Sequence, residues 1–161
     1  MFTIRAGFSD QIELHAGIDA VREFFSDITN FGQLMPGVEQ VHIDAKGIAH
    51  WKVQTDIPVV GKILQKFALE KAEDSEDRVE WSPLRNEAEN LLRYSADFFE
   101  KAKNITLVQF SQVVEMRRKS ARELHILAGM AGESLISNEM TKRVTEMINI
   151  FIGRAKERLE R

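Results

Sequence analysis

Three polar side chains occur among apolar neighbours in segments that alternate as strands do. Tyr94 shares the spacing of Leu92 and Ala96, and Thr55 and Gln112 occupy similar apolar faces in two other segments. Because strand side chains point alternately to opposite faces, these three groups are predicted to point into the protein. Two interpretations stay open: they hydrogen-bond to one another or to bound water, or they orient a polar group on an apolar ligand.

Tyr94 is the one member of this set that is able to act as an acid or a base. A phenol with its ordinary pKa near 10 is a poor catalyst at neutral pH, so catalysis needs a neighbour that shifts the pKa. Arg93 and Asp97 alternate to the opposite face and are expected to be solvated. The sequence therefore indicates no partner for Tyr94.

Metal binding is not supported by the histidine positions. No two histidines are four residues apart, and none forms a cluster with nearby carboxylates on one face. His50 alternates with Trp51 and is expected to point outward. We therefore expect surface histidines and no metal site; the four are His15, His42, His50 and His125.

Covalent catalysis and phosphate binding also lack a motif. The chain has no cysteine and no G-x-S-x-G, and Ser134 in "AGESL" has no strand–turn–helix context. "GMAG", with Gly129 and Gly132, lacks the lysine of a P-loop, so its glycines are interpreted as sites of backbone freedom. We predict no catalytic residue and no cofactor.

The composition narrows the remaining classes of function. The 161 residues carry 22 basic and 25 acidic side chains, a net charge of −3 that gives no electrostatic basis for nucleic-acid binding. The absence of cysteine favours a reducing, cytoplasmic location. No segment approaches the roughly 20 apolar residues of a membrane span, so no stable membrane insertion is expected. The length fits one domain over residues 1–161.

The amino-terminal third combines a long strand with short helices. Residues 2–14 alternate with period two, and Asp10 interrupts the pattern, which suggests a bulge near Ser9–Asp10. Residues 19–29 change to helical spacing, with Asp19 as the expected N-cap. A second short helical turn is expected over residues 30–34, before the apolar stretch "LMPGVE".

The rest of the chain is predicted to form a meander followed by one long helix. Short polar turns separate about six strands between residues 38 and 116. Residues 117–132 mix charges, apolar residues and glycines without a clear period. Helical spacing then covers about residues 133–160, a helix of about 40 Å. Its apolar positions are Ile136, Met140, Val144, Met147, Phe151 and Ala155.

This order of elements resembles the START/polyketide-cyclase superfamily, whose helix-grip fold is shared with the birch-pollen allergen. The segments that carry the resemblance are "FFSDITNF", "LMPGVEQVHI" and "LAGMAGESLISNEM". "MPGVE" is similar to a segment of the branch of this superfamily named after carbon-monoxide dehydrogenase, while "DIPVVGKIL" is longer and more apolar than a plain turn. The resemblance implies an α+β fold: a curved antiparallel sheet of about seven strands, two short helices after the first strand, and a long carboxy-terminal helix that the sheet wraps.

The resemblance also implies a cavity between the sheet and the long helix. Its expected role is to bind a small hydrophobic molecule, such as a lipid, an isoprenoid or an aromatic polyketide. The alternatives are a polyketide cyclase or dehydratase, and an accessory protein for the maturation or recruitment of an oxidoreductase; a homodimer or a partner protein is compatible with either. Met35 is expected at the edge of a plug formed by Ile28, Phe31 and Leu34. The cavity lining is predicted to be Met35, Trp51, Val53, Thr55, Phe67, Trp81, Tyr94, Phe98, Phe110, Gln112, Met140, Val144, Met147 and Phe151.

Overall fold

Seven strands and five helices make up the computed structural model, which describes residues 1–161. The strands are β1 (Phe2–Leu14), β2 (Val38–Ile43), β3 (Ala49–Ile57), β4 (Gly61–Asp74), β5 (Arg78–Pro83), β6 (Asn90–Ala102) and β7 (Ile105–Arg118). The helices are α1 (Ile18–Ser26), α2 (Asn30–Leu34), α3 (Ala121–Leu124), α4 (Ile126–Ala131) and α5 (Glu133–Leu159). The predicted order of strand, two short helices, six strands and long helix is confirmed.

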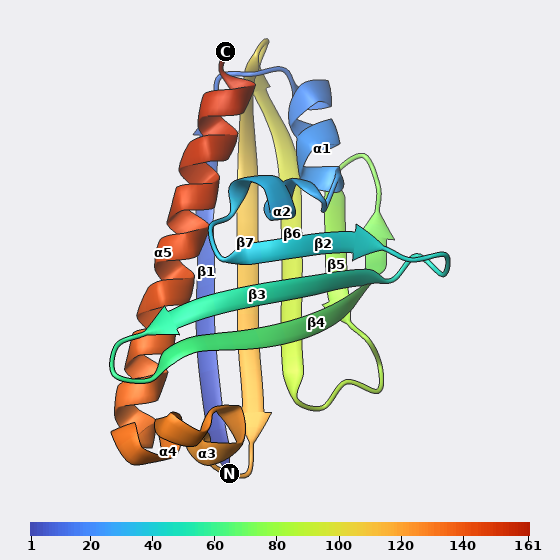
Figure 1. Cartoon of the computed structure of the whole chain (residues 1–161). Coiled ribbons are helices and arrows are strands. Elements are labelled where there is room, and N and C mark those ends of the chain that lie inside the picture. The colour runs from blue at the N-terminus through green and yellow to red at the C-terminus, as the bar shows by residue number, and fades with distance from the viewer.

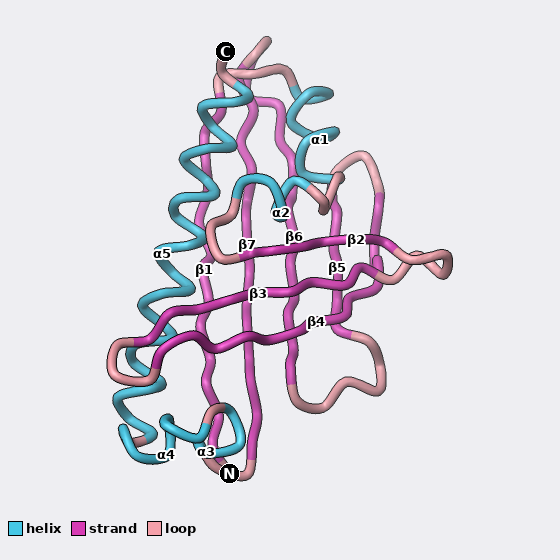
Figure 2. The backbone as a smooth tube through the Cα atoms, in the orientation of Figure 1, coloured by secondary structure: helices cyan, strands magenta, loops and turns pink.

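The strands form one antiparallel sheet in the order β1-β7-β6-β5-β4-β3-β2. Figure 1 shows that β2, β3 and β4 cross in front of β1, β7 and β6, so the sheet bends strongly around its own inner face. Register shifts in β2, β4 and β6 contribute to this bend, because a bulge increases the local twist of a strand. Figure 2 shows the same two crossing sets of strands, with α5 running along one side.

The bulge predicted near Ser9–Asp10 is wrong. β1 pairs with β7 without interruption from Phe2 opposite Arg118 to Leu14 opposite Thr106, and Asp10 stands opposite Phe110. Since β1 is an edge strand, the side chain of Asp10 reaches solvent without a break in the ladder.

Helix α1 begins one residue before its predicted cap. Its N-cap is Gly17, and Asp19 lies in the first turn, where its carboxylate pairs with Arg22 at 3.0 Å. An acidic group in the first turn still interacts favourably with the helix dipole. The apolar face of α1 buries Val21, Phe24 and Phe25 against the sheet.

The segment without a clear period folds as the two short helices α3 and α4. They lie below the sheet at the start of α5 (Figure 1). Gly132 joins α4 to α5 with φ +96°, a conformation that side chains disfavour. Four- and six-residue helices are too short to show a periodic pattern, which is why the sequence did not indicate them.

Helix α5 spans the molecule next to β1 and also contacts β3. Its limits agree with the prediction to within one residue. The predicted apolar stripe of α5 is buried, with one difference. Met147 is only partly buried, and its neighbour Ile148 is fully buried instead. None of the helices combines the length and the apolar character that a membrane span requires.

Candidate ligand-binding cavity

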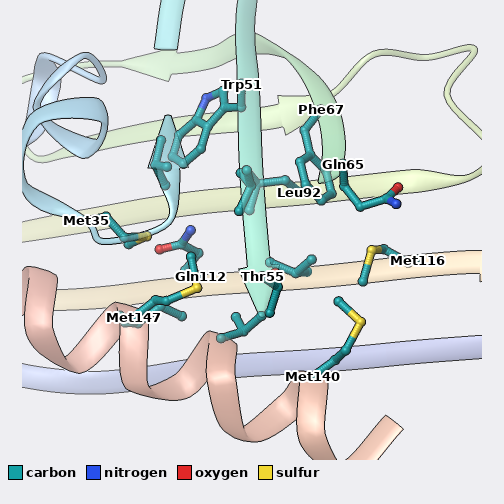
Figure 3. A pocket seen from close by; sticks show the side chains of 15 residues that line it. Met35, Trp51, Thr55, Gln65, Phe67, Leu92, Gln112, Met116, Met140 and Met147 are labelled. Atoms are coloured by element: carbon teal, nitrogen blue, oxygen red, sulfur yellow. The ribbon is translucent and has the colours of Figure 1, made fainter. Parts of the chain in front are cut away.

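An apolar cavity lies between the inner face of the sheet and α5 (Figure 3). β3, β4, β6 and β7 supply one wall, α5 supplies the other, and the segment after α2 closes one side. Twelve of its fifteen lining residues are hydrophobic and none is charged. They are Met35, Val38, Trp51, Val53, Thr55, Gln65, Phe67, Leu92, Gln112, Val114, Met116, Met140, Val144, Met147 and Ile148.

The cavity is small as it stands. The space open to the centre of a water-sized sphere is about 30 Å³, whereas one water needs roughly 10–15 Å³ on this measure. Four of the lining side chains are methionines, Met35, Met116, Met140 and Met147. Methionine has three rotatable bonds and adapts to irregular neighbours, so a larger occupant requires movement of side chains and not of the sheet.

Three polar side chains reach this apolar space: Thr55, Gln65 and Gln112. Gln65 Oε1 is engaged outside it, because it accepts from Asn90 Nδ2 at 3.1 Å and from Arg118 Nη2 at 2.7 Å. Gln112 differs. It is 3% exposed, and its Oε1 has no hydrogen-bond partner. In Figure 3 its amide projects from β7 toward the cavity, with Met35 and Met147 drawn nearby.

Nine of the fourteen residues predicted to line a cavity lie around this one, including Met35, Trp51, Thr55 and Gln112. The other five are buried but lie outside its wall: Trp81, Tyr94, Phe98, Phe110 and Phe151. These five residues do not line the cavity, contrary to the prediction.

For four of them, Tyr94, Phe98, Phe110 and Phe151, the physical reason is an aromatic cluster that fills the other end of the inner face. Phe31 of α2 stacks on Phe151 of α5 with ring centroids 4.3 Å apart and meets Tyr94 edge-on at 4.8 Å. Phe25 of α1 contacts Phe98 and Phe110, both at 6.2 Å. The helices α1 and α2 therefore plug this end with solid aromatic packing, and the open space is confined to the methionine-rich end.

Tyr94 is part of that plug. Its hydroxyl donates to the backbone carbonyl of Phe25 at 2.9 Å, and full burial raises the pKa of the phenol well above its ordinary value of 10. A neutral phenol bonded to a main-chain carbonyl ties α1 to β6. Its hydroxyl is not presented to the cavity.

Six lining residues were missed by sequence reasoning. Leu92 on β6 and Val114 and Met116 on β7 lie two or four residues from predicted lining residues and so share their face of the strand. The period of two residues was therefore a sufficient signal. Ile148 follows Val144 by one helical turn. Gln65 lies two residues before Phe67 on β4, so period two indicated it as well. Val38 had no local signal, since its position depends on how β2 pairs with β3.

The loop after α2 lies between the cavity, which Met35 lines, and a hollow on the surface, which Pro36 and Gly37 line. Gln54 N donates to the Gly37 carbonyl at 2.7 Å, and Arg154 Nη1 donates to the Leu34 carbonyl at 2.9 Å, which fixes the loop to β3 and α5. Outside it lies a surface hollow of about 250 Å³, and Thr55 and Met147 line both this hollow and the inner cavity. These two side chains therefore mark one place where the cavity adjoins a surface hollow.

The histidines do not form a metal centre. His50 points outward, as predicted, and its Nε2 lies 2.8 Å from Asp44 Oδ2, while its ring stacks on His42 at 5.0 Å. No group of three or more His, Cys, Asp or Glu side chains in the chain is arranged to hold a metal ion.

Comparisons with known proteins identify the fold. No family model matches the sequence, and no curated protein matches it significantly. An aromatase/cyclase from Streptomyces sp. R1128 superposes with a TM-score of 0.60 over 96% of this chain and 95% of its own, at 12% identity. A START superfamily protein from Mycobacterium smegmatis has a TM-score of 0.51 over 87% of this chain and 97% of its own, at 14% identity. Norcoclaurine synthase from Thalictrum flavum has a TM-score of 0.50 over 89% and 88%, at 12% identity.

These likenesses establish the class of fold. The chain has an α+β helix-grip fold, which it shares with these three structures and which the order of its elements indicated. At 12–14% identity to them, the shared property is the fold.

Proposed function

We propose that residues 1–161 form one domain that binds a small hydrophobic molecule in the cavity between the sheet and α5, for carriage or sequestration. The observation that carries the proposal is the lining: twelve hydrophobic residues of fifteen, no charge, and four methionines. An enclosed apolar surface with a few polar groups is the usual form of a small-molecule site. The proposal includes a cytoplasmic location, which rests on the absence of cysteine.

Entry would take place between α5 and the loop after α2. Met147 is only partly buried and stands between the outer hollow and the cavity together with Thr55. Rotation of one flexible thioether side chain opens this wall without unfolding an element. The aromatic end offers no comparable path, because its rings pack against one another.

Titration with N-phenyl-1-naphthylamine, an uncharged dye whose emission rises in apolar surroundings, tests the proposal. We expect saturable binding to the native protein. Val144→Phe should abolish it, because the larger ring fills a cavity of about 30 Å³. Leu135→Phe is the matched control, since Leu135 is an exposed position of the same helix that lines neither the cavity nor the outer hollow, and it should bind as the native protein does.

Native mass spectrometry of the purified protein provides a second readout. A copurifying molecule that is absent from Val144→Phe supports the proposal and identifies the ligand. The proposal fails if the dye does not bind and no molecule copurifies. It also fails if Val144→Phe, folded by circular dichroism, binds the dye as well as Leu135→Phe does.

A cyclase or dehydratase of the aromatase/cyclase kind is the second candidate, and the similarity in fold to the aromatase/cyclase from Streptomyces sp. R1128 favours it. Its polar groups in the cavity would be Thr55, Gln65 and Gln112, which orient a substrate but have no ordinary acid–base function at neutral pH. Turnover of a poly-β-ketone mimic by the native protein, lost in Gln112→Leu, would favour this candidate over carriage.

A further inference from the structure

We propose that Gln112 selects an uncharged ligand that carries a hydroxyl group on an apolar body. This inference rests on the proposed function and names the chemical class that the same cavity would take.

The side chain of Gln112 occupies a position where the protein supplies no partner for its amide oxygen. On β7 it stands opposite Phe8 of β1 and opposite Tyr94 of β6. The side chain of Phe8 has no polar atom, and the Tyr94 hydroxyl already donates to the Phe25 carbonyl. The Gln112 amide is 3% exposed and its Oε1 is left unpartnered.

An unpartnered buried amide oxygen is costly, and native proteins rarely contain one without a reason. A leucine of similar size would fill the position at lower cost, because it buries no polar atom. The amide also lies at the cavity and not deep in the aromatic plug. A polar group brought by the ligand is the partner that accounts for it.

The cavity favours a neutral partner. No lining residue carries a charge, so a carboxylate or ammonium group next to Gln112 would be buried without a counter-ion. In the outer hollow, Arg143 Nη1 lies 3.6 Å from Glu146 Oε2, and Asp56 is a second acidic residue of its lining. The hollow therefore offers no net positive charge to an anionic head group, and the cavity itself contains no charged residue for an ionic group of either sign.

A hydroxyl fits the amide better than a group that only accepts or only donates. The carbonyl oxygen of glutamine accepts and its NH₂ donates, whereas a hydroxyl does both. A ligand hydroxyl is therefore able to donate to Gln112 Oε1 or to accept from the amide N–H groups, depending on the orientation of the hydroxyl. The hydroxyl of Thr55, on the same cavity wall, adds a second polar group of the same neutral kind.

Isothermal titration calorimetry with four compounds of one shape tests the inference: 2-naphthol, 2-methoxynaphthalene, naphthalene and 2-naphthoate. We expect the native protein to bind 2-naphthol about three- to tenfold more tightly than naphthalene or the methyl ether, the gain of one neutral hydrogen bond. 2-Naphthoate should bind most weakly. Gln112→Leu should bind 2-naphthol and naphthalene equally. Gln109→Leu, the same change on the outward face of β7 where Gln109 Nε2 donates to Ser9 Oγ, should keep the preference.

The outcomes separate this inference from the function on which it rests. Equal binding of 2-naphthol and naphthalene by the native protein overturns the inference and leaves hydrophobic binding in place. Tightest binding of 2-naphthoate overturns it in favour of an anionic ligand. Failure of all four compounds to bind overturns the inference together with the proposed function.

Thermal unfolding of the ligand-free proteins is an independent readout. We expect Gln112→Leu to raise Tm by about 2–4 °C, since it removes an unpartnered buried oxygen. If Gln112 had a structural role, the same variant would unfold at a lower temperature, and that result would overturn the inference.

Discussion

Tyr94 shows how a residue of catalytic type becomes structural through its surroundings. Its hydroxyl is fully buried and donates to the Phe25 carbonyl, so it holds α1 against β6. Burial raises its pKa well above 10, because the phenolate would lie in an apolar environment. The same residue type at the cavity wall would have had a different role.

Tyr94→Phe should therefore destabilise the protein without changing ligand binding. We expect a loss of about 1–3 kcal/mol in the free energy of unfolding, because the Phe25 carbonyl loses its partner in a buried site. Urea denaturation measures the loss, and dye titration measures binding. Intact stability with lost dye binding would contradict this role for Tyr94.

Gly37 is the residue at which the loop after α2 tolerates least change. Its φ is +85°, and an added Cβ would lie 2.7 Å from the Gln54 carbonyl oxygen and 2.8 Å from Met147 Cε. The conformation requires glycine, and the close approach leaves no room for a side chain.

Gly37→Ala should destabilise the protein more than Gly47→Ala does. Gly47 has a similar φ of +84° but nothing within 4 Å of an added Cβ, so it reports the backbone strain alone. We expect about 1 kcal/mol for Gly47→Ala and a clearly larger loss for Gly37→Ala, measured by urea denaturation. Equal losses would show that the loop yields to the added methyl group.

At the scale of elements, α2 and the loop after it have two different tasks. Phe31 of α2 joins the aromatic plug, while Met35 at the end of the helix lines the cavity. The apolar stretch "LMPGVE" is thus the boundary between a solid and an open half of the inner face. The contact of this loop with α5 and β3 makes it the natural edge of an entrance.

Met147→Ala should speed ligand exchange, because it removes the side chain that separates the outer hollow from the cavity. We expect association and dissociation rates for N-phenyl-1-naphthylamine to rise severalfold in stopped-flow measurements. Met116→Ala is the control: it also enlarges the cavity, but Met116 does not line the outer hollow. Equal acceleration by both variants would place the entrance elsewhere.

At the scale of the whole molecule, acid stability depends in part on a single turn between β2 and β3. Asp44 Oδ1 accepts from the backbone N–H of Lys46 at 2.8 Å and of Ile48 at 3.0 Å. The hydrogen bond with His50, followed by the backbone bond from Ile48, lowers the pKa of Asp44 from 3.8 to about 2.

Because the folded pKa of Asp44 lies below its unfolded value, the carboxylate stabilises the protein above about pH 4. This contribution is lost as the pH falls from about 4 to about 2. Asp44→Asn should make the free energy of unfolding depend less on pH in this window, measured by urea denaturation at successive pH values. An unaltered slope in Asp44→Asn would contradict the assignment.

The sequence by itself determined the elements and the faces that they bury. Period two in β1 and the apolar steps of α5 are local properties, and their predicted limits hold to within one residue. Two predictions failed. β1 pairs without a bulge at Asp10, because its position at the edge of the sheet already exposes that side chain, and α1 begins at Ile18 with Gly17, not Asp19, as its N-cap.

Only the tertiary structure decided where the inner face is solid and where it is open. Every predicted lining residue points inward, but whether it meets a void depends on what comes from elsewhere in the chain. Phe25 of α1 and Phe31 of α2 fill the space next to the aromatic residues of the inner face, which are Tyr94, Phe98, Phe110 and Phe151. The space next to Gln112 and the four methionines stays open as the cavity. Strand period fixes the direction of a side chain, whereas a cavity depends on the volumes that strand pairing and helix docking bring together, and no local pattern records them.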